Sequence, residues 1–358
     1  MLPSAWRSGL QVTLLRAWTH KGLLPCALLP ISISLHGVRL LRRLCYQIGI
    51  FKVGKVGATV IVVGNVVAGG AGKTPTVIAL VNHLKSQGKN VGVVSRGYGR
   101  GDSGTREVTT LSTAHEVGDE PAMLFRVLGV PLFVGASRLL AAQALLLKHP
   151  HVDTIVCDDG MQHYALFRDL EVCVFDTRGC GNGWLLPSGP LRESWPPYAL
   201  RRAGQSDQRR LVLHTGSPPA FEGHAAQRML SDHAVRQNGD LVAISTLCAP
   251  GNLPLLALAG IAKPEAFFAL LRAKGLQLAK TISLPDHYDF HSYSSNTHGG
   301  YTVICTEKDA AKLWQTHPGA LAAPLIQSMP FAFWAQFDAL LQQAQHSRLS
   351  SKNGYSTS

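Results

Sequence analysis

Residues 68 to 76 read AGGAGKTPT, and they follow TVIVVGNVV at 59 to 67, a run rich in β-branched residues. Such a run favours a strand, and a glycine-rich loop between a strand and a helix can bind phosphate groups. The common pattern for this loop is G-x-x-x-x-G-K-[ST]. Val67 stands in the first glycine position, so the match is partial. The residues that we expect to contact a nucleotide's phosphates are Gly69, Gly70, Ala71, Gly72, Lys73, Thr74 and Pro75.

The chemistry of the loop lies in its last positions. Glycines let backbone N–H groups close around phosphate oxygens, Lys73 supplies a cation, and the Thr74 hydroxyl can bind a magnesium ion. Residues 74 to 88 carry apolar side chains at helical spacing, and Pro75 suits the first turn of a helix. The alternative is a glycine turn that ends in Lys-Thr by chance. The flanking strand and helix favour the phosphate loop.

Composition describes a folded chain with a basic N-terminal part. The 358 residues are 46% hydrophobic and 16% charged, which is enough for two domains with buried cores. The net charge is +12, and the first 101 residues hold 13 Lys and Arg and no acid before Asp102. Seven cysteines form no C-x-x-C pair. We interpret them as reduced thiols of a cytosolic compartment.

Residues 1 to 57 are predicted to associate with a membrane surface. Residues 22 to 38 lack charged side chains but contain two prolines and are shorter than the roughly 20 apolar residues of a spanning helix. On a helical wheel, residues 35 to 50 separate into an apolar face and a basic face with Arg39, Arg42 and Arg43. This pattern is typical of an interfacial helix on an anionic leaflet.

Other interpretations of the basic N-terminal part remain. A transit peptide is also Arg-rich and poor in acids, and the helices could simply dock on a soluble domain. A cleavable signal peptide is disfavoured because no A-x-A site follows the apolar run. Nucleic-acid binding is not expected, since aromatic residues do not alternate with the basic ones.

Beyond the loop, strands and helices alternate. Apolar strand patterns occur at 90 to 100, 130 to 134 and 153 to 160, and a helical pattern lies at 137 to 148. This alternation predicts a mainly parallel sheet with helices on both faces. Ligands of such sheets bind at the carboxyl ends of the strands. The residues that follow each apolar run are therefore the candidates for the site.

Two acidic pairs and one long loop stand at such positions. Asp158 and Asp159 end the apolar run TIVC, where an acid beside a phosphate loop helps to hold magnesium, although Asp-Gly is also a common turn. Asp119 and Glu120 lie in EVGDEPAML, where either could simply cap a helix. The glycine- and proline-rich loop 181 to 194 carries Arg192, and long loops of this kind often close over sites.

Eight motifs occur in order between about residues 58 and 313. They are GNVVAGGAGKTP (64 to 75), SRGYGR (95 to 100), GDEP (118 to 121), DDGMQH (158 to 163), GNGWLLPSGPLRE (181 to 193), AGIAKPEAFF (259 to 268), PDHYDF (285 to 290) and TEKDAAKL (306 to 313). Any one of them would be a weak signal, but eight in this order are specific. Taken together, they resemble the motifs of the tetraacyldisaccharide 4′-kinases.

The resemblance implies an activity and a cellular location. Members of this family move the γ-phosphate of ATP, with Mg²⁺, to the 4′-hydroxyl of the lipid A disaccharide 1-phosphate and so make lipid IVA. They are bacterial enzymes of the cytoplasmic face of the inner membrane. An acceptor in the membrane agrees with the basic, apolar N-terminal part of this chain.

The resemblance also implies roles for individual residues. Asp119 would be the catalytic base, oriented by His287, and Arg192 would face the transferred phosphoryl group. Lys73 would bind the β- and γ-phosphates. The residues implied at the metal ion or its waters are Thr74, Glu120, Asp158 and Asp159.

We expect a phosphate-loop kinase domain at 58 to 239, a smaller α/β domain at 240 to 342, and a disordered tail at 343 to 358. In the smaller domain, strands are predicted at 241 to 246, 254 to 261 and 301 to 306, with a helix at 264 to 274.

Three other classes compete. Regulatory membrane ATPases place a lysine before the double glycine, where this chain has Ala68. GTPases use an N-K-x-D motif, which TEKDA at 306 to 310 does not provide. A nucleotide-binding membrane adaptor without kinase activity remains the alternative. The set of Asp119, Asp159, Arg192 and His287 argues against it.

Overall fold

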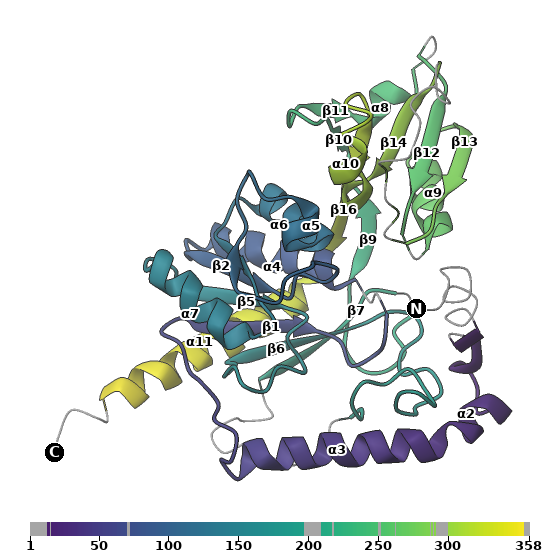
Figure 1. Ribbon diagram of the computed structural model, residues 1–358. Helices are drawn as coiled ribbons and strands as arrows, with labels where there is room; N and C mark the ends of the chain where they lie inside the picture. The colour runs from purple at the N-terminus through teal and green to yellow at the C-terminus, as the bar shows by residue number, and fades with distance from the viewer. Residues whose placement is uncertain are drawn as a thin grey trace. The chain divides into compact units, whose positions relative to one another are not determined.

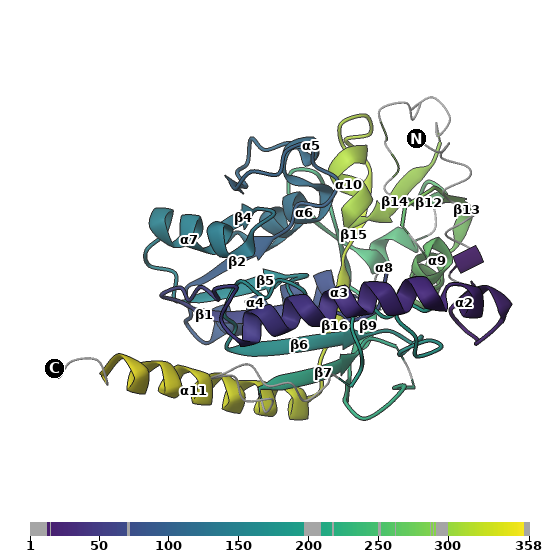
Figure 2. The same ribbon diagram turned by 60° about the horizontal axis from the view of Figure 1, so that its bottom comes forward.

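The computed structural model describes residues 13 to 353 except 15, 70, 71, 197 to 208, 217, 250, 251, 262, 287, 289 and 291 to 299. The chain forms two compact units (Figures 1 and 2). The first unit contains Met1–Arg96, Val130–Ala226 and Met329–Ser358. The second contains Gly97–Gly129 and Gln227–Ser328. Each is described by itself.

The first unit is built on a parallel sheet with the strand order β4-β2-β5-β1-β6-β7-β8. The six residues of β1 are all buried, which explains the unbroken β-branched run TVIVVG. The predicted parallel sheet is therefore confirmed. The bounds are β1 Thr59–Gly64, β2 Val91–Ser95, β4 Leu132–Val134, β5 Thr154–Asp158, β6 Leu170–Phe175, β7 Arg210–His214 and β8 His224–Ala225.

Three helices of the first unit derive from amphipathic patterns. Helix α4, Lys73–Ser86, follows β1 through the glycine-rich loop. Helix α7, Arg138–Lys148, packs against β2 and β4, and its Leu145 is buried in the core of the unit. Helix α11, Phe331–Asn353, contacts α4, because its Trp334 ring stacks on the His83 ring with centroids 4.0 Å apart.

The N-terminal part forms helices α2, Leu23–Ala27, and α3, Leu29–Gln47. In Figure 1, α3 is the long purple helix beneath the strands of its unit. One side of α3 contacts the protein, since Ser32 Oγ donates to the Leu185 carbonyl at 2.8 Å. Among the described residues, no helix combines the length and hydropathy that a membrane crossing requires.

The second unit contains a sheet with the order β11-β10-β15-β14-β12-β13 and an antiparallel pair β9-β16. Strands β12 to β15 are parallel to one another, and β10 is antiparallel to β11 and β15. The strand bounds are β3 Arg106–Glu107, β9 Gln227–Leu230, β10 His233–Val235, β11 Leu241–Ala243, β12 Leu255–Ala259, β13 Leu278–Ser283, β14 Thr302–Thr306, β15 Leu321–Ala323 and β16 Leu325–Ser328. The helices are α5 Ala114–Val117, α6 Asp119–Leu128, α8 Ile244–Leu247, α9 Pro264–Ala273 and α10 Glu307–Leu313.

The unit boundaries differ from the expected domains. Residues 97 to 129 belong with 227 to 328. One reason is that α6 packs on α10, where the Arg126 guanidinium lies 5.2 Å from the centre of the Trp314 ring. The second unit also begins earlier than residue 240. Contacts between segments so distant in sequence leave no mark in local composition.

The expected tail also differs. Residues 343 to 353 continue α11 instead of being disordered, and 354 to 358 lie outside the described residues. Within this stretch, Arg348 binds both carboxylate oxygens of the buried Asp169 at 2.7 Å and donates to the Val56 carbonyl at 2.9 Å. This bidentate ion pair gives a polar sequence a fixed partner. The predicted strand at 241 to 246 ends at Ala243, where α8 begins.

Candidate functional site

The glycine-rich loop joins β1 to α4. Gly72 is the N-cap of α4 with a positive φ of 84°, a conformation that glycine adopts without strain. The Asn65 side chain stabilises the loop from within, donating to the Gly69 carbonyl at 3.0 Å. Its amide oxygen accepts a hydrogen bond from Lys73 Nζ at 3.3 Å. Gly70 and Ala71, which we expect to contact phosphates, lie outside the described residues.

Asp159 lies beside the loop, directly after β5. Its carboxylate is 3.4 Å from Lys73 Nζ and 3.3 Å from an Arg192 guanidinium nitrogen. Burial pushes the pKa of Asp159 upward, but Lys73 and Arg192 outweigh it, so the pKa lies below its usual value. The first unit therefore brings together three predicted site residues from three separate motifs.

Asp158 has different surroundings from its neighbour. It is the last residue of β5, is buried, and accepts a hydrogen bond from Ser95 Oγ at 3.0 Å. Asp159 has a positive φ of 48°, a turn conformation that Asp tolerates better than most residues. The two adjacent carboxylates thus have different partners, Ser95 for one and the cations Lys73 and Arg192 for the other.

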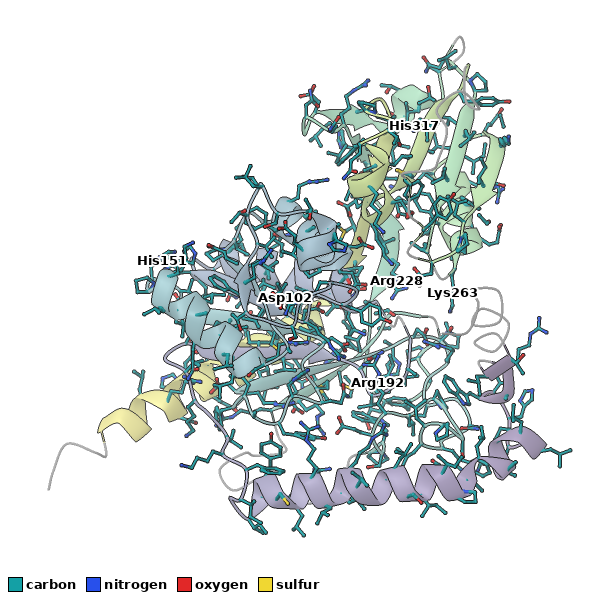
Figure 3. All side chains as sticks on the ribbon, in the orientation of Figure 1. Asp102, His151, Arg192, Arg228, Lys263 and His317 are labelled. Atoms are coloured by element: carbon teal, nitrogen blue, oxygen red, sulfur yellow. The ribbon has the colours of Figure 1, made fainter. Side chains whose placement is uncertain are left out.

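The loop that carries Arg192 is paired with the phosphate loop. The Ala68 N–H donates to the Pro190 carbonyl at 2.7 Å, and the Arg192 N–H donates to the Val66 carbonyl at 2.6 Å. On its other side, Arg39 of α3 donates to the Arg192 carbonyl at 2.7 Å. Arg192 therefore lies between α3 and the end of the sheet (Figure 3).

Two contributors to this region were missed from the sequence. One is Asn65, described above. The other is Arg178, which forms an ion pair with Asp176 at 2.9 Å and donates to the Ala68 carbonyl at 3.2 Å. Both follow the carboxyl ends of central strands, β1 and β6, so inspection of those strand ends could have found them.

In the second unit, Asp119 is the first residue of α6. The N-cap of this helix is Gly118, so Asp119 is not the capping residue. Gly118 has a φ of 93°, and a Cβ atom there would lie 2.9 Å from the Tyr98 carbonyl oxygen. The SRGYGR and GDEP motifs therefore meet at a point where only glycine fits.

The Asp119 carboxylate is held by a lysine that sequence reasoning did not single out. Lys312 Nζ lies 2.8 Å from Asp119 Oδ2, and both side chains are mostly withdrawn from solvent. Lys312 also donates to the Tyr288 carbonyl at 3.3 Å. Glu120 follows Asp119 and is partly buried. His287 lies outside the described residues, so its pairing with Asp119 stays a prediction.

The oxygen ligands at the phosphate loop fit magnesium. No group of three His, Cys, Asp or Glu side chains gathers anywhere in the described part of the chain. Magnesium does not require such a group, because it keeps several waters and is bound through one or two carboxylates and the substrate's phosphates. The Asp159 carboxylate and the Thr74 hydroxyl carry oxygen atoms of the kind that magnesium binds. Thr74 follows Lys73 in the chain, and the Asp159 carboxylate lies 3.4 Å from Lys73 Nζ.

Comparisons with known proteins identify the family of the chain. The family model described as tetraacyldisaccharide-1-P 4′-kinase matches residues 24–349. The tetraacyldisaccharide 4′-kinase of Polaromonas sp. (strain JS666) is 51% identical and covers 96% of this chain and 100% of its own length. The corresponding protein of Acidovorax sp. (strain JS42) is 50% identical over 91% of this chain and 93% of its own length.

A solved structure is also similar. The crystal structure of LpxK from Aquifex aeolicus in complex with ATP has a TM-score of 0.75 and 26% identity. It covers 90% of this chain and 99% of that one. With the family model matching most of its length, the chain belongs to the tetraacyldisaccharide-1-phosphate 4′-kinase family.

Proposed function

We propose that this chain transfers the γ-phosphate of ATP to the 4′-hydroxyl of tetraacyldisaccharide 1-phosphate, giving lipid IVA. Membership of a kinase family supports the reaction type and the lipid A precursor as acceptor. The observation that carries the proposal in the structure is the cluster of Lys73, Asp159 and Arg192 beside the glycine-rich loop. A non-catalytic adaptor would not need two cations and an acid at this point.

On the nucleotide side, the residues position charge. Lys73 and the backbone N–H groups of the loop bind the β- and γ-phosphates, and Arg192 neutralises charge on the transferred group. When bound by Asp159, Thr74 and their neighbours, Mg²⁺ would neutralise further phosphate charge. Because Lys73 and Arg192 both contact Asp159, one carboxylate holds the two cations beside the loop.

On the acceptor side, Asp119 accepts the proton of the 4′-hydroxyl, and His287 orients its carboxylate. Glu120 and Asp158 support the metal ion or its waters. Asp119 is suited to this role because its side chain is 14% exposed and held by an ion pair. A carboxylate with a fixed orientation transfers a proton more efficiently than a solvated one.

Residues 1 to 57 attach the protein to an anionic membrane, at the cytoplasmic face of the bacterial inner membrane. The support comes from α3. Four apolar residues about one turn apart, Val38, Leu41, Leu44 and Ile48, are between 45% and 66% exposed. Arg42 is exposed beside them. Exposed apolar side chains along one helix mark a membrane or partner surface, and the basic side chains favour anionic lipid.

The test is transfer of labelled γ-phosphate from ATP to the lipid disaccharide monophosphate in mixed micelles. Asp119→Ala is expected to lose roughly 10²- to 10⁴-fold in kcat, since a general base contributes about that factor. Asp232→Asn is the control, because Asp232 is an acid of the same unit whose side chain is 83% exposed and forms an ion pair with Lys274.

Two outcomes would count against the proposal. Undiminished transfer by Asp119→Ala removes the proposed base while leaving the kinase activity in place. No transfer by the wild type, with ATP still bound, favours the adaptor.

Loss of vesicle binding on deletion of residues 1 to 50 is expected, and unchanged binding contradicts the membrane role of α3.

A further inference from the structure

The motif TEKDAAKL has no role in the proposed transfer, yet the structure gives its residues specific contacts. It covers the end of β14 and helix α10. Thr306 is the N-cap of α10. Its hydroxyl accepts from the Asp309 N–H at 3.2 Å and donates to Asp309 Oδ2 at 2.6 Å. The start of the helix is thereby fixed to the end of the strand.

Asp309 connects the helix to a second strand. It is buried, and its Oδ2 also accepts a hydrogen bond from the Gly260 N–H at 3.0 Å, just beyond the end of β12. A Cβ atom on Gly260 would lie 2.9 Å from Asp309 Oδ1. Helix α10 is therefore attached closely to two adjacent parallel strands and forms a rigid support.

This support presents two lysines one turn apart. Residues four apart lie on the same face of a helix. Lys308 Nζ lies 3.0 Å from Asp286 Oδ1. Lys312 Nζ lies 2.8 Å from Asp119 Oδ2 and 3.3 Å from the Tyr288 carbonyl oxygen. The Lys312 ammonium group therefore contacts both the proposed base, Asp119, and the backbone of the PDHYDF segment.

We propose that Lys312 is a positioning residue for Asp119, which it holds in one orientation while tying it to the backbone at Tyr288. This inference rests on the proposed function, in which Asp119 is the base. Lys312 does not itself touch the reacting atoms. An ammonium group bound to Oδ2 restricts rotation of the carboxylate, and loss of that restriction lowers the fraction of encounters in which the proton can transfer.

The experiment compares Lys312→Met, Lys312→Arg and Lys308→Met in the phosphate-transfer assay. We expect Lys312→Met to lower kcat roughly 10- to 100-fold, as misplacement of a reacting group does, with the KM for ATP within about twofold of wild type. Lys312→Arg should recover most of kcat because it keeps a cation at the carboxylate. Lys308→Met is the matched control and should stay within about threefold of wild type.

Several results would overturn the inference. A kcat within twofold of wild type for Lys312→Met does so directly. An increase only in the KM for the lipid would show that Lys312 binds substrate instead. Equal losses in Lys312→Arg and Lys312→Met, with lowered melting temperatures in both, would reduce its role to stability.

A double variant separates this inference from the proposed function. In an Asp119→Asn background, the further change Lys312→Met should lower the residual kcat by less than about twofold, since coupled residues are non-additive. If Lys312→Met lowers kcat by the same factor in the Asp119→Asn background as in the wild type, Lys312 acts independently of Asp119. If Asp119→Asn alone keeps full activity, the base assignment fails first.

Discussion

Asp159 and Glu307 each follow the carboxyl end of a parallel strand, one in each unit, and both are partly buried. Their pKa values are displaced in opposite directions. At Asp159, burial raises the pKa, but Lys73 and Arg192 outweigh it, and the net result is a lowered pKa. At Glu307, burial raises the pKa to about 7, and a hydrogen bond from the Leu325 backbone opposes it only in part.

The difference shows what keeps a carboxyl group charged at the end of a buried strand. Position at the end of a buried strand withdraws a carboxyl group from water, which favours its neutral form. Only cations supplied by other segments keep it charged. At Asp159 these cations come from the glycine-rich loop and from the loop 181 to 194. In the second unit, a cation also lies against Asp119, since Lys312 Nζ is 2.8 Å from its carboxylate.

The largest expected effect comes from removing the central cation of the first unit. Lys73→Met deletes a phosphate-binding charge and one of the two cations that keep Asp159 ionised. We expect kcat/KM for phosphate transfer to fall roughly 10³-fold, the upper range for one electrostatic contact to a transferring group. Lys85→Met, on the exposed end of the same helix, is the control. Near-normal transfer by Lys73→Met would show that Asp159 and Arg192 suffice.

The next effect separates the two adjacent aspartates. Asp159→Asn keeps a residue that tolerates positive φ but removes the charge, and we expect about a 10²-fold loss in kcat. Asp158→Asn should lose less, because Asp158 accepts a hydrogen bond from the Ser95 hydroxyl, whereas Lys73 and Arg192 form ion pairs with Asp159. Phosphate-transfer assays with a titration of Mg²⁺ measure both variants. The Mg²⁺ concentration that gives the half-maximal rate should rise more for Asp159→Asn than for Asp158→Asn. Equal losses would contradict the distinction between their surroundings.

The smallest effect concerns Glu307 and stability. Its folded pKa of about 7 lies above the unfolded value near 4.5, so the folded state binds more protons between these two values. Stability from this residue is therefore present below pH 4.5 and is lost as pH rises through about 7. Glu307→Gln should raise the free energy of unfolding at pH 8 by roughly 2 kcal/mol relative to wild type, with little change at pH 4.5.

Thermal unfolding of the wild type and Glu307→Gln at pH 5 and pH 8 measures this difference. Asp240→Asn, on an exposed turn of the same unit, is a suitable control. A difference in melting temperature that is the same at both pH values would mean that Glu307 is already ionised in the folded protein.

Local patterns predicted most of the parallel sheet and the helices that follow its strands. The run at 59 to 64, the strand at 154 to 158 and the helix at 138 to 148 all lie where periodicity indicated. These elements follow from side chains buried on both faces of a sheet or on one face of a helix, and such burial leaves a pattern in the sequence. The α-helical pattern of residues 35 to 47, which lie in α3, was readable for the same reason.

Contacts between distant segments were not predictable in this way. Lys312 lies 193 positions from Asp119 along the chain and Arg39 lies 153 from Arg192, yet each pair is in contact. Nothing in the residues around Lys312 marks it as different from Lys308, one turn earlier. The same holds for Arg348, which lies in the segment predicted to be disordered but is part of α11 and forms an ion pair with Asp169.

Local sequence patterns predicted the glycine-rich loop and the alternation of strand and helix, and the ordered motifs indicated the kinase family. Which charges meet became visible only in the folded chain: Asp159 with Lys73 and Arg192, and Asp119 with Lys312. The two kinds of information differ because the underlying interactions act over different separations along the chain. Burial and backbone conformation act between residues a few positions apart and leave a periodic record, whereas ion pairs depend on side chains that only folding brings within a few ångströms.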